Sequence, residues 1–129
     1  MNNLCRGAWA EAVFDVYACS QLWEVSEPIY PCAYDRIINR GAGVFERVQI
    51  KKSVFRKGRS FGFVHWVPGG TSRRPRRYSA SDFDWLAAVD VVGGAIWLIP
   101  WTAARAAKSG VSLSQHVLEY MVMQDWQAC

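Results

Sequence analysis

Four polar residues in the first half of the chain have the types and the spacing that metal-assisted hydrolysis requires. Asp35 opens one predicted β-strand, and Gln49 and Lys51 lie in the next, beyond a turn that contains two glycines. Because side chains alternate along a strand, Gln49 and Lys51 share one face, and a short hairpin can bring Asp35 beside them. The fourth residue, Glu11, precedes the hairpin on a predicted helix.

This combination of residues suits the hydrolysis of a phosphodiester. Carboxylate and amide oxygens are ligands that Mg²⁺ accepts, with water and substrate phosphate completing the octahedron. Asp35 and Gln49 are therefore expected metal ligands, and Glu11 can join them directly or through water. Mn²⁺ accepts the same oxygen donors and is expected to substitute for Mg²⁺. Lys51 can hold the attacking water and stabilise charge on the phosphoryl oxygens.

The order of these residues resembles the PD-(D/E)xK nuclease superfamily. The similarity is carried by Gly7 and Glu11 on the first helix, by Tyr34 and Asp35, and by the run 47–51. It is closest to the small homing endonucleases encoded in group I introns, and the archaeal Holliday-junction resolvases share the same core. Later residues extend the resemblance to roughly residues 6–106, namely Tyr78, Asp82, Asp84 and the run 95–100.

The resemblance implies a fold and a set of catalytic residues. The fold is a restriction-endonuclease-like core of the α/β (α+β) class, with a central mixed β-sheet flanked by helices. The implied catalytic residues are Glu11, Asp35, Gln49 and Lys51, of which the first three bind the metal. This chain has Gln49 where the superfamily usually has an acidic residue, a replacement known in the intron-encoded branch. The loss of one negative charge implies a weaker or single metal site.

Length and composition favour one compact domain over residues 1–129. The chain is 51% hydrophobic and 20% charged, which suffices for one core and leaves no room for a second. No signal peptide or membrane span is evident, so we expect a soluble, cytoplasmic protein of a prokaryotic or phage-encoded setting, not a secreted one. The four cysteines form no CxxC pair, which argues against a structural zinc site.

The distribution of charge indicates a nucleic-acid partner. Between Arg47 and Arg77 there are ten basic residues and no acidic one, whereas the rest of the chain carries five basic and eleven acidic residues. A basic arm over about residues 52–78 would hold DNA next to the proposed metal site and make binding steeply dependent on salt. The residues expected to contact DNA are Lys52, Arg56, Lys57, Arg59, Arg73, Arg74, Arg76 and Arg77.

The remaining elements follow from periodicity and turn residues. Helices are predicted at 5–22, 102–108 and 112–126, strands at 23–30 and 61–67, and hairpins at 34–38 with 44–54 and at 84–92 with 95–99. The last helix would carry an apolar face that either completes the core or forms a dimer interface. Two sites are needed to cut two strands, so a homodimer or higher assembly is expected.

Four functions remain open at the level of sequence. The first is an Mg²⁺-dependent DNA endonuclease of the homing type. The second is a structure-selective Holliday-junction resolvase, which would cut branched DNA irrespective of sequence. The third is a non-catalytic DNA-binding module, favoured if Gln49 abolishes metal binding. The fourth is an RNA-binding protein, which basic charge alone suggests.

Overall fold

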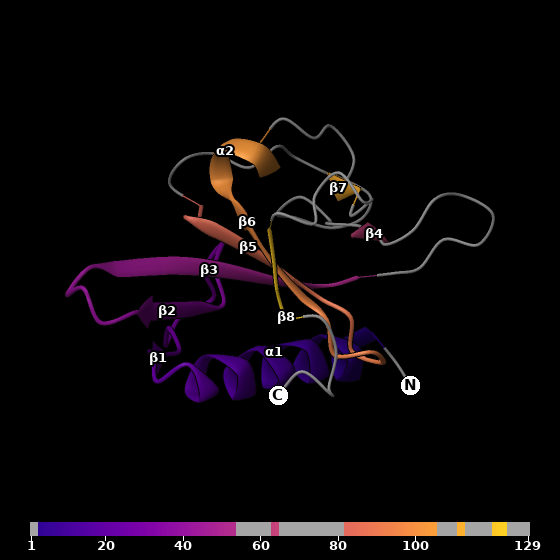
Figure 1. Cartoon of the computed structure of the whole chain (residues 1–129), viewed down its shortest axis with the longest axis horizontal. Coiled ribbons are helices and arrows are strands. Elements are labelled where there is room, and N and C mark those ends of the chain that lie inside the picture. Colours follow the sequence, from indigo (N-terminus) through magenta and orange to yellow (C-terminus); the bar gives the residue numbers. More distant parts are fainter. Residues whose placement is uncertain (1–2, 54–62, 65–81, 106–110, 113–119, 124–129) are drawn as a thin grey trace.

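The protein is built around a six-stranded mixed sheet with strand order β1-β2-β3-β5-β6-β8. A computed structural model describes residues 3–53, 63–64, 82–105, 111–112 and 120–123. Its elements are α1 (Asn3–Ser20), β1 (Glu24–Ser26), β2 (Arg36–Asn39), β3 (Phe45–Lys52), β4 (Phe63–Val64), β5 (Trp85–Val89), β6 (Ile96–Pro100), α2 (Trp101–Ala104), β7 (Val111–Ser112) and β8 (Met121–Met123). Figure 1 shows α1 lying along one side of the sheet and α2 at the far end of β6.

The predicted central hairpin forms from β2 and β3. The strands pair antiparallel, with Arg36 opposite Val48 and Asn39 opposite Phe45. Gly41 and Gly43 have φ values of 100° and 75°, which residues with a side chain rarely adopt. Their N–H groups donate to Oδ1 of Asn39 at 2.9 and 3.3 Å. The glycines and the asparagine side chain therefore close the turn and fix the register of the hairpin.

One parallel pairing joins the two antiparallel halves of the sheet. β3 lies parallel to β5, with Gln49 opposite Leu86 and Lys51 opposite Ala88, whereas β5 and β6 form the second predicted hairpin. Asp84 stabilises the start of the β3–β5 pairing through two hydrogen bonds to Arg47. Its Oδ2 accepts the backbone N–H of Arg47 at 2.7 Å, and its own N–H donates to the Arg47 carbonyl at 2.9 Å. The expected mixed sheet with flanking helices is confirmed.

Alternation along the strands divides the core into two layers. On one face, α1 packs through Phe14 against Val48 and Ile50 of β3 and against neighbouring strands. On the other face, Leu86 and Ala88 of β5 belong to a second cluster that includes Ala104 of α2. Because Val48 and Ile50 face α1, the alternate residues Gln49 and Lys51 lie on the opposite face of β3.

The predicted helix over residues 112–126 is wrong for the residues that the structure describes. Val111–Ser112 is strand β7, paired with β4, and Met121–Met123 is strand β8, paired with β6. Met123 is buried in the core cluster beneath α1. Hydrogen bonding of residues 121–123 to the edge of β6 outweighs the helical periodicity of the sequence there. Met121 and Val122 therefore do not provide the helical dimer face that the sequence suggested, whereas Val117 and Leu118 lie outside the described residues.

Two smaller differences concern the ends of elements. β1 covers three residues of the predicted strand 23–30, and the helix expected at 102–108 begins at Trp101, with residues 106–108 outside the described part. Of the predicted strand 61–67 the structure describes Phe63–Val64, which is β4.

No helix in the described ranges has the length and apolar character needed to cross a membrane.

Phe14 provides a direct test of the packing between α1 and the sheet. Its side chain is fully buried, so Phe14→Ala should lower the free energy of unfolding by about 3–5 kcal/mol through lost transfer energy and the cavity left behind. Urea denaturation followed by circular dichroism measures this change. Val16→Ala, on the same helix but 59% exposed, should change stability by no more than about 0.5 kcal/mol. Equal losses for the two variants would contradict the assigned helix face.

Candidate active site

Asp35 lies just before β2 begins, at the point where the pairing of β2 with β3 ends. Its N–H donates to the carbonyl of Val48 at 2.8 Å, which extends the pairing one residue beyond the strand. Its Oδ2 accepts the backbone N–H of Ile50 at 2.8 Å. The carboxylate oxygen therefore takes the place of the backbone carbonyl with which the Ile50 N–H would pair if β2 were longer. Because Ile50 lies between Gln49 and Lys51 in β3, this hydrogen bond holds the Asp35 carboxylate close to those two residues.

Gln49 and Lys51 share one face of β3, as predicted, and this is the face opposite α1. Gln49 is buried, with 9% of its surface exposed. Its amide oxygen is a hard donor of the kind that Mg²⁺ accepts. Lys51 is half-buried, and its ammonium group interacts electrostatically with Asp35.

Glu11 approaches from the other face of the sheet and is connected to Asp35 through an arginine. Oε1 of Glu11 accepts a hydrogen bond from Nη1 of Arg36 at 3.0 Å. The same Nη1 donates to the backbone carbonyl of Asp35 at 2.7 Å. Asp15, one turn along α1 from Glu11, accepts from Nε and Nη2 of Arg36 at 2.9 and 3.0 Å. The fold thus brings Glu11, Asp35 and Lys51 into one electrostatically coupled group, with Gln49 alongside on β3.

The titration behaviour of these groups reflects burial and their shared charge. Burial raises the pKa of Asp35, and the Ile50 N–H and the charge of Lys51 offset part of that rise. Burial and the negative charge of Asp35 raise the pKa of Glu11. Burial lowers the pKa of Lys51 against the opposing attraction of Asp35. Displacements of this kind, with named charged partners, are typical of functional sites.

Arg36 was not among the residues singled out from sequence. Hydrogen bonding to Asp15 raises its pKa further above the usual value, so it is permanently charged. The signal for it is the four-residue spacing of Glu11 and Asp15, which places both carboxylates on one helix face, together with the buried strand position that Arg36 occupies. Only the tertiary packing shows that these three residues meet.

The residue types of the site are ones that an oxygen-preferring divalent cation accepts. Within the described ranges, no three side chains of the His, Cys, Asp and Glu types gather into a metal-binding cluster. The two carboxylates and one amide of Glu11, Asp35 and Gln49 are the smaller set that Mg²⁺ uses when water and phosphate supply the rest. A cation here would relieve the repulsion between the carboxylates of Glu11 and Asp35.

Of the residues expected to contact DNA, only Lys52 falls in the described part of the chain. It is the last residue of β3 and is half-buried. The others, Arg56, Lys57, Arg59, Arg73, Arg74, Arg76 and Arg77, lie outside the described residues, so their contacts stay a prediction.

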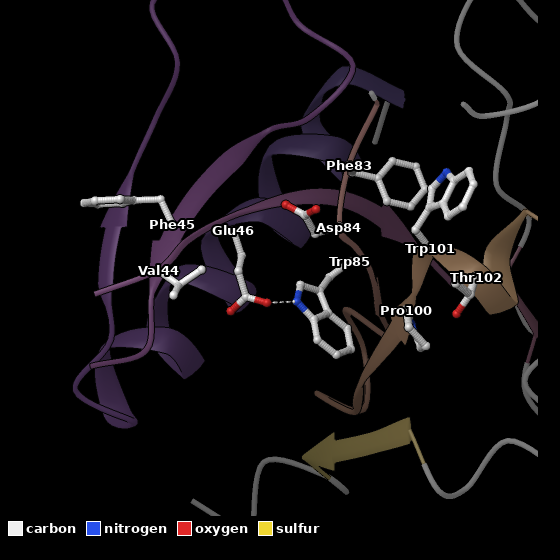
Figure 2. A pocket seen from close by; sticks show the side chains of 9 residues that line it. All are labelled: Val44, Phe45, Glu46, Phe83, Asp84, Trp85, Pro100, Trp101 and Thr102. Atoms are coloured by element: carbon white, nitrogen blue, oxygen red, sulfur yellow. Dashed lines mark hydrogen bonds between the residues drawn. The ribbon is translucent and has the colours of Figure 1, made fainter. Parts of the chain in front are cut away.

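A separate pocket of about 460 Å³ lies at the other end of β3. Figure 2 shows Phe45 and Glu46 on one side of it and Trp85, Pro100 and Trp101 on the other, with the indole N–H of Trp85 donating to Glu46. Its two carboxylates are already paired, Glu46 with Arg40 and Asp84 with Arg47. None of the four predicted catalytic residues lines this pocket.

Comparison with known proteins identifies a solved structure with the same fold. No protein-family model matches the chain, and no curated protein matches it significantly. Among solved structures, the chain is similar to one described as a bacterial homing endonuclease, I-Ssp6803I, with a TM-score of 0.81 and 20% sequence identity. The match covers 94% of this chain and 89% of that one. At this identity the similarity establishes a shared fold.

The raised pKa of Asp35 predicts a stability cost of its charge. Because its pKa is higher in the folded protein than in the unfolded chain, the folded state binds more protons, and stability falls as pH rises from the unfolded pKa towards the folded one. With chelator present, Asp35→Asn should therefore gain stability relative to wild type as pH rises above the ordinary pKa of an aspartate. Urea denaturation at several pH values measures the difference.

Glu24→Gln is the matched control, because Glu24 is an exposed carboxylate on β1, away from this group. Its free energy of unfolding should stay within about 0.5 kcal/mol of the wild-type value. A stability difference for Asp35→Asn that does not change with pH would contradict the buried, charge-coupled placement of Asp35.

Proposed function

We propose that this protein is an Mg²⁺-dependent DNA endonuclease of the PD-(D/E)xK superfamily, with Gln49-x-Lys51 in place of the usual acidic motif. The observation that carries the proposal is the electrostatic coupling of Glu11, Asp35 and Lys51 at the point where the pairing of β2 with β3 ends. The similarity of the fold to a bacterial homing endonuclease supports a DNA substrate and the homing type of activity.

Each residue has a distinct role in this proposal. Asp35 and Gln49 hold the metal through their carboxylate and amide oxygens, and Glu11 contributes directly or through a bound water. When bound, Mg²⁺ supplies Lewis-acid activation of the scissile phosphate and of water. Lys51 orients the attacking water and donates to the phosphoryl oxygen on which negative charge develops. Asp35 also keeps Lys51 oriented, because the two charges attract each other within a partly desolvated site.

The charge balance of the site favours a divalent cation. Four carboxylates, those of Glu11, Asp15, Glu27 and Asp35, are connected to Arg36 or Lys51 by hydrogen bonds, ion pairs or electrostatic interactions. Among the described residues, two cationic side chains do not balance these four anionic ones, so their sum is negative even though the whole chain carries a formal charge of +4. A metal ion would offset that excess at the position proposed for the scissile phosphate.

Binding of DNA is attributed to the basic arm over residues 52–78. The arm begins in the sequence at the end of β3, so a duplex bound to it would lie close to the proposed site. Each phosphate contact would make the affinity more dependent on salt. One active site cuts one strand, so double-strand cleavage would need at least a homodimer. Guanine contacts by arginines of the arm would provide sequence specificity.

Removal of Lys51 should separate catalysis from DNA binding. Lys51→Ala should lower the cleavage rate by about 10²–10³-fold, because a donor to the developing negative charge is lost, while affinity for duplex DNA stays within about threefold. Arg105→Ala is the matched control, since it removes an exposed positive charge at the end of α2 and should cleave like wild type. The assay uses plasmid and linear duplex with Mg²⁺ or chelator, alongside DNA binding by fluorescence anisotropy.

The same assay separates the alternatives. Preferential cleavage of a synthetic four-way junction over duplex would indicate a resolvase. Binding of DNA by the wild type without cleavage in Mg²⁺ or Mn²⁺ would indicate a non-catalytic module and contradict the proposal. Retained cleavage in Lys51→Ala would remove that residue from the chemistry.

Gln49 can be tested by restoring the missing charge. Gln49→Glu should bind Mn²⁺ about tenfold more tightly, because a carboxylate replaces a neutral amide oxygen as ligand. Gln49→Leu, of similar size but without an oxygen, should weaken binding by a comparable factor. Isothermal titration calorimetry measures both values. Unchanged affinity in the two variants would show that Gln49 is not a ligand.

A further inference from the structure

We propose that Arg36 is a positioning residue of the active site, which sets the relative placement of Glu11 and Asp35 for metal binding. The inference rests on the proposed function, because it assigns a role towards the same metal. Arg36 itself touches neither the metal nor the substrate in this proposal. It acts through the two acidic residues that flank it, one on α1 and one at the start of β2.

A single nitrogen of Arg36 connects the two residues. Nη1 donates to Oε1 of Glu11 at 3.0 Å and to the backbone carbonyl of Asp35 at 2.7 Å. The backbone N–H of Asp35 is held by Val48, and its carboxylate by Ile50. With its carbonyl held by Arg36, both hydrogen-bonding groups of the Asp35 main chain are engaged, and its carboxylate accepts the N–H of Ile50.

The guanidinium group is itself held rigidly. Only 9% of the Arg36 side chain is exposed. Asp15 accepts two of its hydrogen bonds in a bidentate pair, and Glu27 lies 3.8 Å from Nη1. Because a planar guanidinium has a fixed fork of donors, the pair with Asp15 determines where Nη1 points. Glu11 and Asp35 are therefore placed relative to each other by a rigid bridge between helix and hairpin.

Arginine is required by this geometry, because three acceptors lie in different directions around one side chain. A lysine at position 36 would keep the positive charge but has no planar fork, so it cannot serve Asp15, Glu11 and the Asp35 carbonyl in fixed directions. Residues that orient metal ligands typically change metal affinity by about 10–100-fold when replaced. Arg36→Lys is therefore the informative variant, because it separates geometry from charge.

The experiment measures Mn²⁺ affinity of the full chain by calorimetry and the cleavage rate as a function of Mn²⁺ concentration. Arg36→Lys should raise the Kd for Mn²⁺ by about tenfold or more and should shift the half-saturating Mn²⁺ concentration equally. At saturating Mn²⁺ its rate should return to within about threefold of wild type. A merely structural role would lower the rate at all metal concentrations without moving the Kd.

Two further variants complete the test. Asp15→Asn keeps Arg36 but weakens the ion pair that orients it, so it should raise the Kd for Mn²⁺ by a smaller factor. This variant replaces Arg36→Lys in the test if Arg36→Lys does not fold. Arg40→Lys is the matched control, because Arg40 forms a similar bidentate pair with Glu46 at 2.8 and 3.1 Å on the same hairpin. It should leave the Kd unchanged.

Failure of the inference can be distinguished from failure of the proposed function. If wild type binds Mn²⁺ and cleaves DNA while Arg36→Lys and Asp15→Asn have the wild-type Kd, the positioning role is overturned and the nuclease assignment stands. The same holds if Arg40→Lys shifts the Kd as much as Arg36→Lys does. If wild type neither binds Mn²⁺ nor cleaves DNA, the proposed function fails and takes the positioning role with it.

Discussion

The buried guanidinium of Arg36 constrains how the first helix meets the sheet. A charge removed from water is tolerated only when its hydrogen bonds are satisfied, so α1 must present Asp15 and Glu11 at the distance and angle that Arg36 dictates. The same contact reaches the main chain of Asp35. Arg36 therefore couples three features of the structure. These are the packing of α1, the start of β2 and the placement of the acidic residues.

Strand β3 serves both the core and the site because its side chains alternate. Val48 and Ile50 face α1 and contribute to the larger apolar cluster, which immobilises the strand. Gln49 and Lys51 face the other way, and the N–H of Ile50 holds the Asp35 carboxylate. The site therefore lies on a strand that is held by apolar packing on its α1 face and by parallel pairing with β5 along one edge. Such rigidity preserves the spacing that metal binding demands.

Sequence reasoning succeeded where local patterns coincide with tertiary ones. The glycine-rich turn at 41–43 and alternation in 45–52 specify the hairpin, and hence the common face of Gln49 and Lys51. It failed at residues 121–123, where the free edge of β6 decides the structure and no short-range signal reports it. It also missed Arg36, whose partners lie 21 and 25 residues away along the chain, a separation that no periodicity encodes.

The most direct test of the central claim is to locate a bound divalent ion. In ¹⁵N-labelled protein, substoichiometric Mn²⁺ broadens amide signals near its binding site, so the residues that broaden first identify the ligands. If Asp35 and Gln49 form the metal site with Glu11 beside them, the amide signals of Asp35 and Ile50 should broaden first, and excess Mg²⁺ should restore them. Broadening centred on Glu46 and Asp84, or none at all, would contradict the assignment of this sheet edge as a nuclease active site.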